Sequence, residues 1–138
     1  MKLDPAALPG DALEFLTERG LATLTTLRRD GTPHVVPVGF TYDPETRLAR
    51  VITSGDSIKA RNAGRPGAVA AICQVDGARW LTVSGPIRVD PSSEGVADAV
   101  ARYAIRYRPP RENPKRVALV MDVTAILASV HFGAQGVI

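Results

Sequence analysis

Apolar and polar positions alternate along much of the chain, and this pattern predicts a protein built mainly of β-strands. In segment 33–42, for example, His34, Val36, Val38 and Phe40 would share one face. A period of two residues is typical of a strand that is buried on one side. On the same basis strands are expected at 21–28, 33–42, 47–53, 68–75, 79–89 and 116–123, with 125–130 extending or following the last.

The predicted strands are joined mostly by short turns. Asp30-Gly31 supplies the positive φ of a tight hairpin, and segments 43–46 and 76–78 are similar turns. Pro37 cannot donate a ladder hydrogen bond, so its strand is expected at an edge or a bulge. Such short connections favour antiparallel neighbours. We therefore expect a mainly β fold, a six-stranded antiparallel sheet or barrel with helices between the strands.

Three helices are expected, at 4–20, at 57–64 and from Pro91-Ser92 onward. The third has the clearest apolar stripe, with positions spaced by three and four residues. No linker separates domains, so residues 1–138 are expected to form a single domain. A six-stranded barrel is filled by its own side chains, and a ligand would bind outside it or at a subunit seam. The apolar stripe of the third predicted helix comprises Val96, Ala99, Val100, Tyr103, Ala104 and Tyr107.

Composition and charge narrow the ligand. The 138 residues carry a formal net charge of +3 without a run of like charges, which suits an anionic small molecule better than nucleic acid. No window approaches the ~18 apolar residues of a membrane span. Cys73 is the single cysteine, expected as an inert core thiol, and this fits the cytoplasm.

The residues that usually carry catalysis are scarce. His34, His131 and Cys73 lie at no metal-ligand spacing, so no metal is expected. The sequence contains neither the Gly-x-Ser-x-Gly motif of a nucleophile elbow nor a glycine-rich dinucleotide or phosphate loop. No catalytic residue is assigned from the sequence.

Segment 50–62 is the strongest candidate for binding an anion. Ser57 would cap the short helix, whose first turn has unpaired N–H groups, and Lys59 and Asn62 would share one helix face. Arg50 and Thr53 would lie on opposite strand faces unless the strand bulges. The residues alone leave two interpretations open, a phosphate site or a simple cap with solvated surface charges.

Other positions carry weaker signals. Segment 36–38 would form either an apolar wall for a flat ring or part of the core. Trp80, with Gln74 and Asp76 nearby, would stack on a ligand or bury at a subunit interface. A basic region would be a solvated face or a site for carboxylates; it comprises Arg102, Arg106, Arg108, Arg111, Lys115 and Arg116.

Taken together and in order, these segments resemble a known family. Residues 31–38, 50–53 and 57–62 are similar to the pyridoxamine-phosphate-oxidase-like split β-barrel flavoproteins, and closer to the actinobacterial branch that binds the deazaflavin coenzyme F420. Within that branch, segments 74–81 and 102–114 resemble F420-dependent biliverdin reductases. The C-terminal segment 130–138 lacks the Trp and Arg of the oxidase itself, which argues against oxidase activity.

The resemblance implies a homodimer of split barrels with two cofactor sites at the seam. It implies that Ser57, Lys59 and Asn62 hold the cofactor phosphate, and that the other subunit contributes the 74–80 segment. The remaining cofactor-binding residues implied are Val36, Pro37 and Val38 near the ring, Arg50, Val51, Ile52 and Thr53 along the cofactor, and Gln74, Asp76, Ala78, Arg79 and Trp80 from the partner.

The implied activity is hydride transfer from reduced F420 to a conjugated small molecule, such as biliverdin, giving bilirubin. Because the cofactor would carry the chemistry, no acid-base pair is required for it. Two alternatives stay open: an FMN-dependent oxidoreductase of the same fold, and a carrier that binds F420 or flavin without turnover.

Overall fold

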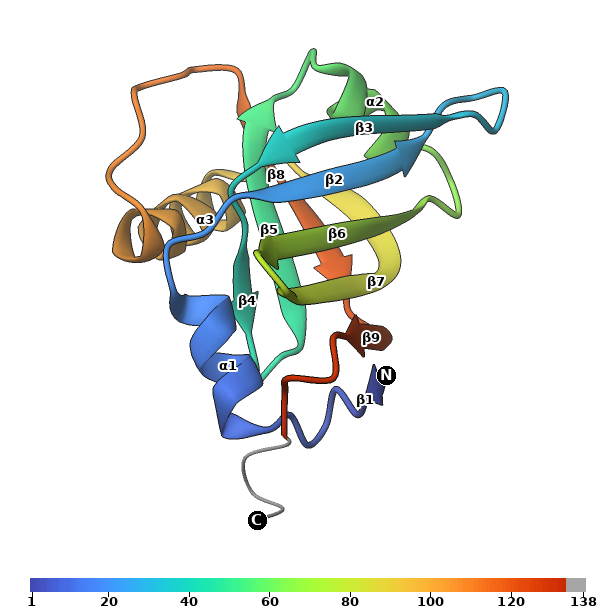
Figure 1. Ribbon diagram of the computed structural model, residues 1–138. Helices are drawn as coiled ribbons and strands as arrows, with labels where there is room; N and C mark the ends of the chain where they lie inside the picture. The colour runs from blue at the N-terminus through green and yellow to red at the C-terminus, as the bar shows by residue number, and fades with distance from the viewer. Residues whose placement is uncertain (134–138) are drawn as a thin grey trace.

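The computed structural model describes residues 1–133, which form nine strands and three helices (Figure 1). Residues 134–138, part of the C-terminal segment compared with the oxidase and of the predicted 1–138 domain, lie outside the described residues. No helix within 1–133 is long and apolar enough to cross a membrane. The elements are β1 Lys2–Leu3, α1 Gly10–Thr17, β2 Ala22–Leu27, β3 Pro33–Val38, β4 Thr41–Asp43, β5 Leu48–Ser54, α2 Ile58–Ala63, β6 Val69–Asp76, β7 Arg79–Asp90, α3 Ser93–Arg106, β8 Arg116–Asp122 and β9 Ala125–Ala128.

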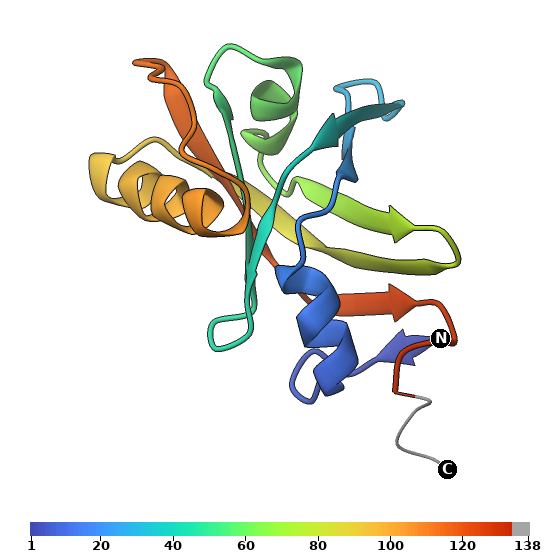
Figure 2. The ribbon, with the colours of Figure 1, turned by 60° about the vertical axis from the view of Figure 1, so that its left-hand side comes forward.

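All strand pairs are antiparallel, and the long strand β7 belongs to both halves of the sheet. The strand order is β3-β2-β6-β7-β8-β5-β4, with β9 paired to β7 and β1 paired to β9. Residues 81–84 of β7 pair with β9, whereas residues 87–90 pair with β8. The switch occurs at Gly85, where an added Cβ would collide with the carbonyl oxygen of Asp122. Figure 2 shows the two parts of the sheet splaying apart.

The expectation of six strands in a barrel is wrong in two respects. Nine strands form, since β1 is added, the predicted segment 125–130 forms a separate strand β9, and the predicted strand 33–42 divides into β3 and β4. The sheet is also not closed: β3 and β4 stand at its two ends and do not pair within residues 1–133. Pro37 lies on the edge strand β3, as its missing N–H predicts.

Strand 33–42 breaks at Gly39 because the chain must cross there from one half of the sheet to the other. The rings of Tyr103 and Tyr107 pack against this point. A Cβ on Gly39 would lie 3.1 Å from the Tyr103 ring and 3.2 Å from the Tyr107 ring. The contact joins positions more than 60 residues apart, so alternation along the chain alone does not reveal it.

Local signals are confirmed at turns and helix ends. Gly31 has φ of 86°, and the Asp30 carboxylate accepts hydrogen bonds from the backbone and side chain of Thr32. The Ser57 and Ser92 hydroxyls cap α2 and α3 by accepting from Ala60 N and Gly95 N. The first helix begins later than expected, at Gly10 instead of residue 4.

The core fills the space between the inner faces of the two halves. Its largest fully buried side chains come from most of the elements, and the Phe15 ring of α1 packs at a tilt of 52° on Phe132, with ring centroids 5.1 Å apart. α3 covers the far face of β5 and β8, where Ala99 packs on Ala118 and Val120. The buried core includes Phe15, Leu24, Phe40, Ile72, Leu81, Leu119, Met121 and Ile126.

Candidate functional site

Two neighbouring hollows lie where the chain after β3 meets the end of α3, one extending towards the start of α2 and the other towards residues 19–21 after α1. The first, which we name the Lys59 hollow, has a volume of about 270 Å³. Its walls are apolar on the β3 side and basic on the α2 and β8 side. It is lined by Pro37, Val38, Gly39, Ile52, Thr53, Lys59, Tyr103, Pro110, Asn113 and Arg116.

Lys59 is the most informative residue of this hollow. It is half-buried, and among residues 1–133 it forms no salt bridge. Burial lowers its pKa because the ammonium is partly desolvated without a compensating carboxylate. A partly buried cation without an anion beside it is typical of a binding site for an anionic ligand.

The outer wall of the Lys59 hollow is held in place by the loop that follows α3. The Asn113 side chain donates to Ser54 Oγ over 2.7 Å, and Gly55 N donates to the Lys115 carbonyl over 2.8 Å. The ammonium of Lys115 also lies 3.3 Å from the Asp56 carboxylate. These contacts fix Asn113 and Arg116 against the turn before α2, which gives the hollow a defined second cation.

Five predicted site residues line this hollow together: Pro37, Val38, Ile52, Thr53 and Lys59. Ser57 lies just behind them, where its hydroxyl accepts from Thr53 Oγ1 over 3.2 Å as well as capping α2. Val51 is 3% exposed and belongs to the core, because it faces inward from β5. Val36 is partly buried against the same core.

The structure does not bring Arg50 into the Lys59 hollow. Strand β5 stays regular, so Arg50 points to the opposite face from Thr53 and lies under α3, 3.5 Å from Asp98. Arg102 bridges the same carboxylate and that of Asp43. Burial lowers the pKa of Arg50, and Arg102 adds to this, while Asp98 opposes it.

Asn62 is 3% exposed, and both ends of its amide are engaged within the chain. Its nitrogen donates to Thr26 Oγ1 over 2.9 Å, and its oxygen accepts from Arg65 over 2.7 Å. These bonds tie α2 to β2. They thereby fix the helix backbone from which the Lys59 side chain extends. Whether Asn62 also contacts a ligand stays a prediction.

The residues expected from the partner subunit line neither hollow of their own chain and lie at the end of the β6–β7 hairpin, although Gln74 packs against Gly20 of the second hollow described below. Gln74 is buried and bridges the Phe15 carbonyl and Arg106. Arg79 contacts Glu18 and Asp76. Ala78 is exposed in the turn and Trp80 is half-buried.

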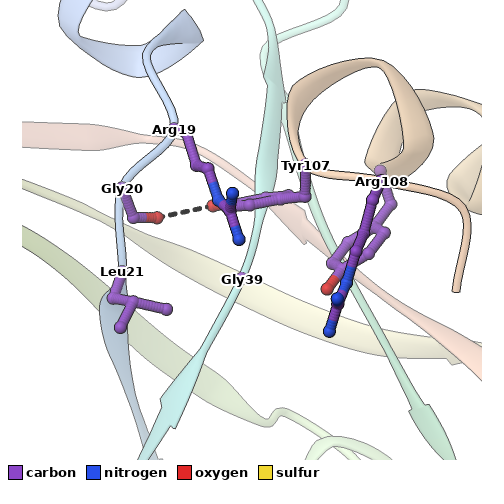
Figure 3. A pocket seen from close by; sticks show the side chains of 7 residues that line it. Arg19, Gly20, Leu21, Gly39, Tyr107 and Arg108 are labelled. Carbon is purple, nitrogen blue, oxygen red and sulfur yellow. Dashed lines mark hydrogen bonds between the residues drawn. The ribbon is translucent and has the colours of Figure 1, made fainter.

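The second hollow, which we name the Arg19 hollow, has a volume of about 390 Å³ (Figure 3). It shares Gly39 and Tyr103 with the Lys59 hollow, so the two adjoin. The Tyr107 hydroxyl donates to the Gly20 carbonyl over 2.7 Å at its floor. Burial raises the pKa of Tyr107. The lining residues are Arg19, Gly20, Leu21, Gly39, Tyr103, Tyr107 and Arg108.

Sequence reasoning treated the basic region around α3 as one set, and the structure divides it. Arg106 is a buried anchor that donates to the Glu18 carbonyl and to Gln74, and it stacks over the Phe40 ring at 4.8 Å. Arg108 and Arg116 line the two hollows. Tyr103 and Gly39 were missed as site residues. For Tyr103 the only local signal was its four-residue spacing from Tyr107.

Comparisons with known proteins agree with this architecture. Residues 8–129 match the family model for pyridoxamine 5'-phosphate oxidase. The chain is 56% identical over 122 residues to the F420H(2)-dependent biliverdin reductase of Mycobacterium tuberculosis (strain CDC 1551 / Oshkosh), covering 88% of each chain.

Two solved structures share the fold. A conserved hypothetical protein of M. tuberculosis superposes with a TM-score of 0.75 at 17% identity, covering 94% of this chain and 89% of the other. An F420 reductase gives a TM-score of 0.67 at 26% identity, covering 83% and 94% respectively. With its split antiparallel sheet and a family match over nearly its whole length, the chain belongs to the pyridoxamine 5'-phosphate oxidase family.

Proposed function

We propose that this protein is a reductase that uses reduced coenzyme F420 to convert biliverdin to bilirubin. The observation that carries the proposal is Lys59, a half-buried cation without a carboxylate partner in residues 1–133, facing an apolar wall across the Lys59 hollow. The 56% identical relative is itself an F420H(2)-dependent biliverdin reductase. The geometry of the Lys59 hollow and the similarity to this relative therefore both support F420 as the ligand.

The residues of the Lys59 hollow fit the groups of a deazaflavin cofactor. Lys59 and Arg116 would hold the phosphodiester, with Thr53 Oγ1 and Asn113 as polar neighbours. Pro37, Val38 and Ile52 would flank the flat ring. When bound in reduced form, the deazaflavin supplies a hydride.

The contribution of the chain to this reaction is binding and orientation. None of the described residues that line the Lys59 hollow is a carboxylic acid or a histidine. The backbone near the hollow is fixed by the Asn113–Ser54, Gly55–Lys115 and Asn62–Thr26 contacts. A rigid frame of this kind contributes to rate by positioning, which can replace much of the need for an acid-base pair.

The test is a pair of titrations followed by turnover. Purified protein is titrated with F420 and separately with FMN, and oxidation of reduced F420 is then followed with biliverdin present. We expect F420 to bind more tightly than FMN and biliverdin to accelerate the oxidation. Tight FMN binding without affinity for F420 would refute the proposal, and F420 binding without turnover of biliverdin would indicate a carrier.

We also propose that the protein is a homodimer, because the sheet face formed by β3, β2, β6, β7 and β9 carries no charge, with Lys2 of β1 only at its margin. The outward side chains of β3, β2, β6, β7 and β9 follow each other across the strands in register. Val69 is 50% exposed and Val75 is 58% exposed on this face. The face consists of Pro33, Val35, Pro37, Thr23, Thr25, Leu27, Val69, Ala71, Cys73, Val75, Trp80, Thr82, Ser84, Ala125 and Leu127.

Two features of this uncharged face support a second copy as its cover. Cys73 was expected in the core, but it lies on this face and is only half-buried, so strand β6 exposes an apolar side. Pro37 belongs both to the face and to the Lys59 hollow. A partner on the face would therefore border the hollow, and Val75 and Trp80 would carry the hairpin of residues 74–80 into the seam.

The oligomeric state tests this arrangement. Ala71→Arg places a charge at the centre of the uncharged face, and we expect light scattering to show a monomer. The matched variant Ala97→Arg, on the exposed side of α3, should keep the wild-type mass. A wild-type protein that is monomeric at micromolar concentration would refute the dimer.

A further inference from the structure

We propose that the Arg19 hollow binds the carboxylates of the substrate, with Arg19 and Arg108 as the two cations that receive them. The inference rests on the proposed function and assigns the class of ligand for this second hollow: a flat conjugated molecule that carries two carboxylates. Biliverdin, with its two propionates, belongs to that class. Four observations support the assignment.

The backbone around Arg19 is fixed, although its side chain is exposed. Arg106 Nε donates to the Glu18 carbonyl over 2.9 Å, and Tyr107 Oη donates to the Gly20 carbonyl over 2.7 Å. The same Tyr107 oxygen accepts from Phe40 N over 3.2 Å. The carbonyls on both sides of Arg19 thus accept hydrogen bonds from residues at the end of α3. The backbone that carries the Arg19 guanidinium is therefore held in one position.

The charges of Arg19 and Arg108 are not used within the described chain. Within residues 1–133 only four of the 14 arginines form salt bridges, and Arg19 and Arg108 are among the ten that do not. The neighbouring Glu18 carboxylate is engaged by Arg79, 3.2 Å away. Two arginines therefore face one hollow whose lining contains no carboxylate, which is the arrangement that binds a dicarboxylate through paired N–H donors.

The hollow also has an aromatic wall. The Tyr103 and Tyr107 rings lie 4.9 Å apart between centroids, at an interplanar angle of 32°. Gly39 allows both rings to approach the β3–β4 connection, since a Cβ there would lie 3.1 Å from the Tyr103 ring. Tyrosine faces next to arginines suit a conjugated ring system that ends in carboxylates.

The position of the Arg19 hollow relates it to the cofactor site. Gly39 and Tyr103 line both hollows. A molecule held by Arg19 and Arg108 would lie directly beside whatever fills the Lys59 hollow. In Figure 3 the side chains of Arg19 and Arg108 extend in the same direction from opposite walls. This adjacency is what transfer between two bound molecules requires.

The test compares two double variants that remove equal charge. Arg19→Met with Arg108→Met empties the proposed site of cations, while Arg29→Met with Arg61→Met removes two exposed arginines that line neither hollow. Equilibrium titration measures the Kd of biliverdin with oxidised F420 present, and a separate titration measures the Kd of F420. Thermal unfolding shows whether each double variant is folded, and the same measurement is made on both single variants.

We expect the Arg19/Arg108 variant to bind biliverdin at least tenfold more weakly, with the Kd of F420 within twofold of wild type. The Arg29/Arg61 variant should match wild type in both. Biliverdin dimethyl ester should bind wild type as weakly as the diacid binds the Arg19/Arg108 variant, and that variant should not distinguish ester from acid.

Three results would overturn the inference, and they separate it from the proposed function. If wild type reduces biliverdin but the Arg19/Arg108 variant binds it normally, only this inference fails. If the variant loses F420 affinity instead, the hollow holds the carboxylate tail of the cofactor. If wild type neither binds nor reduces biliverdin, the proposed function and this inference both fail.

Discussion

Lys59 and Arg50 are two cations from the same 13-residue segment, and the structure gives them opposite surroundings. Arg50 lies under α3, with Asp98 3.5 Å away and Arg102 bridging the same carboxylate to Asp43. Lys59 lies in an apolar-walled hollow and forms no salt bridge within residues 1–133. Both have a lowered pKa from desolvation, but only one has a charge partner.

This difference separates a cation that belongs to the fold from one that is left for a ligand. A desolvated charge costs stability unless something pairs with it. In Arg50 the chain provides the pair. In Lys59 the pair is missing, and the simplest reason for keeping such a residue is an anion that arrives from outside. The predictions below test that distinction, beginning with the largest expected effect.

Replacing Lys59 by Met should raise the Kd of F420 about 30-fold, a loss of about 2 kcal/mol of binding free energy. The free energy of unfolding should stay the same or rise slightly, because the variant removes a desolvated ammonium. Titration of F420 and chemical denaturation measure the two quantities. Arg61→Met, on the exposed side of the same helix, is the control and should change neither. Equal losses of affinity in both variants would contradict a specific role for Lys59.

Replacing Asn62 by Ala should lower the free energy of unfolding by roughly 1 to 2 kcal/mol. The change removes the donor to Thr26 Oγ1 and one of the two acceptors of the Arg65 guanidinium, which keeps the Leu27 carbonyl at 3.0 Å. Urea denaturation gives the number, with Arg61→Ala on the exposed side of the same helix as the control. If Asn62→Ala retains full stability but loses F420 affinity, Asn62 contacts the ligand directly, contrary to its internal bonding here.

Replacing Arg50 by Met should change stability by less than about 1 kcal/mol, because Asp98 keeps Arg102 and a buried guanidinium nitrogen without a partner is removed. The Kd of F420 should move less than twofold. A larger loss of F420 affinity than Lys59→Met causes would show that Arg50, predicted from the sequence as a cofactor residue, reaches the ligand after all.

The pH dependence of stability and of F420 affinity should give the smallest effect. Since burial lowers the pKa of Lys59, the folded protein releases this proton before the unfolded chain does. Stability of the free protein should therefore rise with pH through that range, while F420 affinity falls as the ammonium is lost. F420 titrations from neutral to alkaline pH measure the decline. The decline attributable to Lys59 should disappear in Lys59→Met, and an unchanged decline there would assign it to another group.

The sequence predicted most strands and turns, because alternation and Asp-Gly or Asp-Pro turns are local signals. The hydroxyl cap at Ser57 and the position of Lys59 were predictable for the same reason. By contrast, β1 contains only two residues, too short to show a period, whereas the predicted segment 125–130 does form a strand, β9. Their pairing depends on contacts between the two ends of the chain.

The hollows themselves were not predictable, since their walls meet only in three dimensions. Gly39 and Tyr103 are 64 positions apart, and Asn113 reaches Ser54 across 59. The side of β5 on which Arg50 lies depended on whether the strand bulged, and sequence could not decide that. In the sequence Arg106 resembles a surface charge, whereas in the structure the backbone of residues 18–20 folds against it.

Strand β7 has a consequence for how the molecule opens. Its first half is hydrogen-bonded to β6 and β9, and its second half to β8, on the two sides of Gly85. Neither half of the sheet can detach without disturbing a strand that the other half shares. Amide protons in β6 and β8 should consequently exchange with solvent through the same global opening, at one common free energy. The walls of the Lys59 hollow, drawn from β3 in one half and β5 in the other, would then persist or vanish as a single cooperative unit.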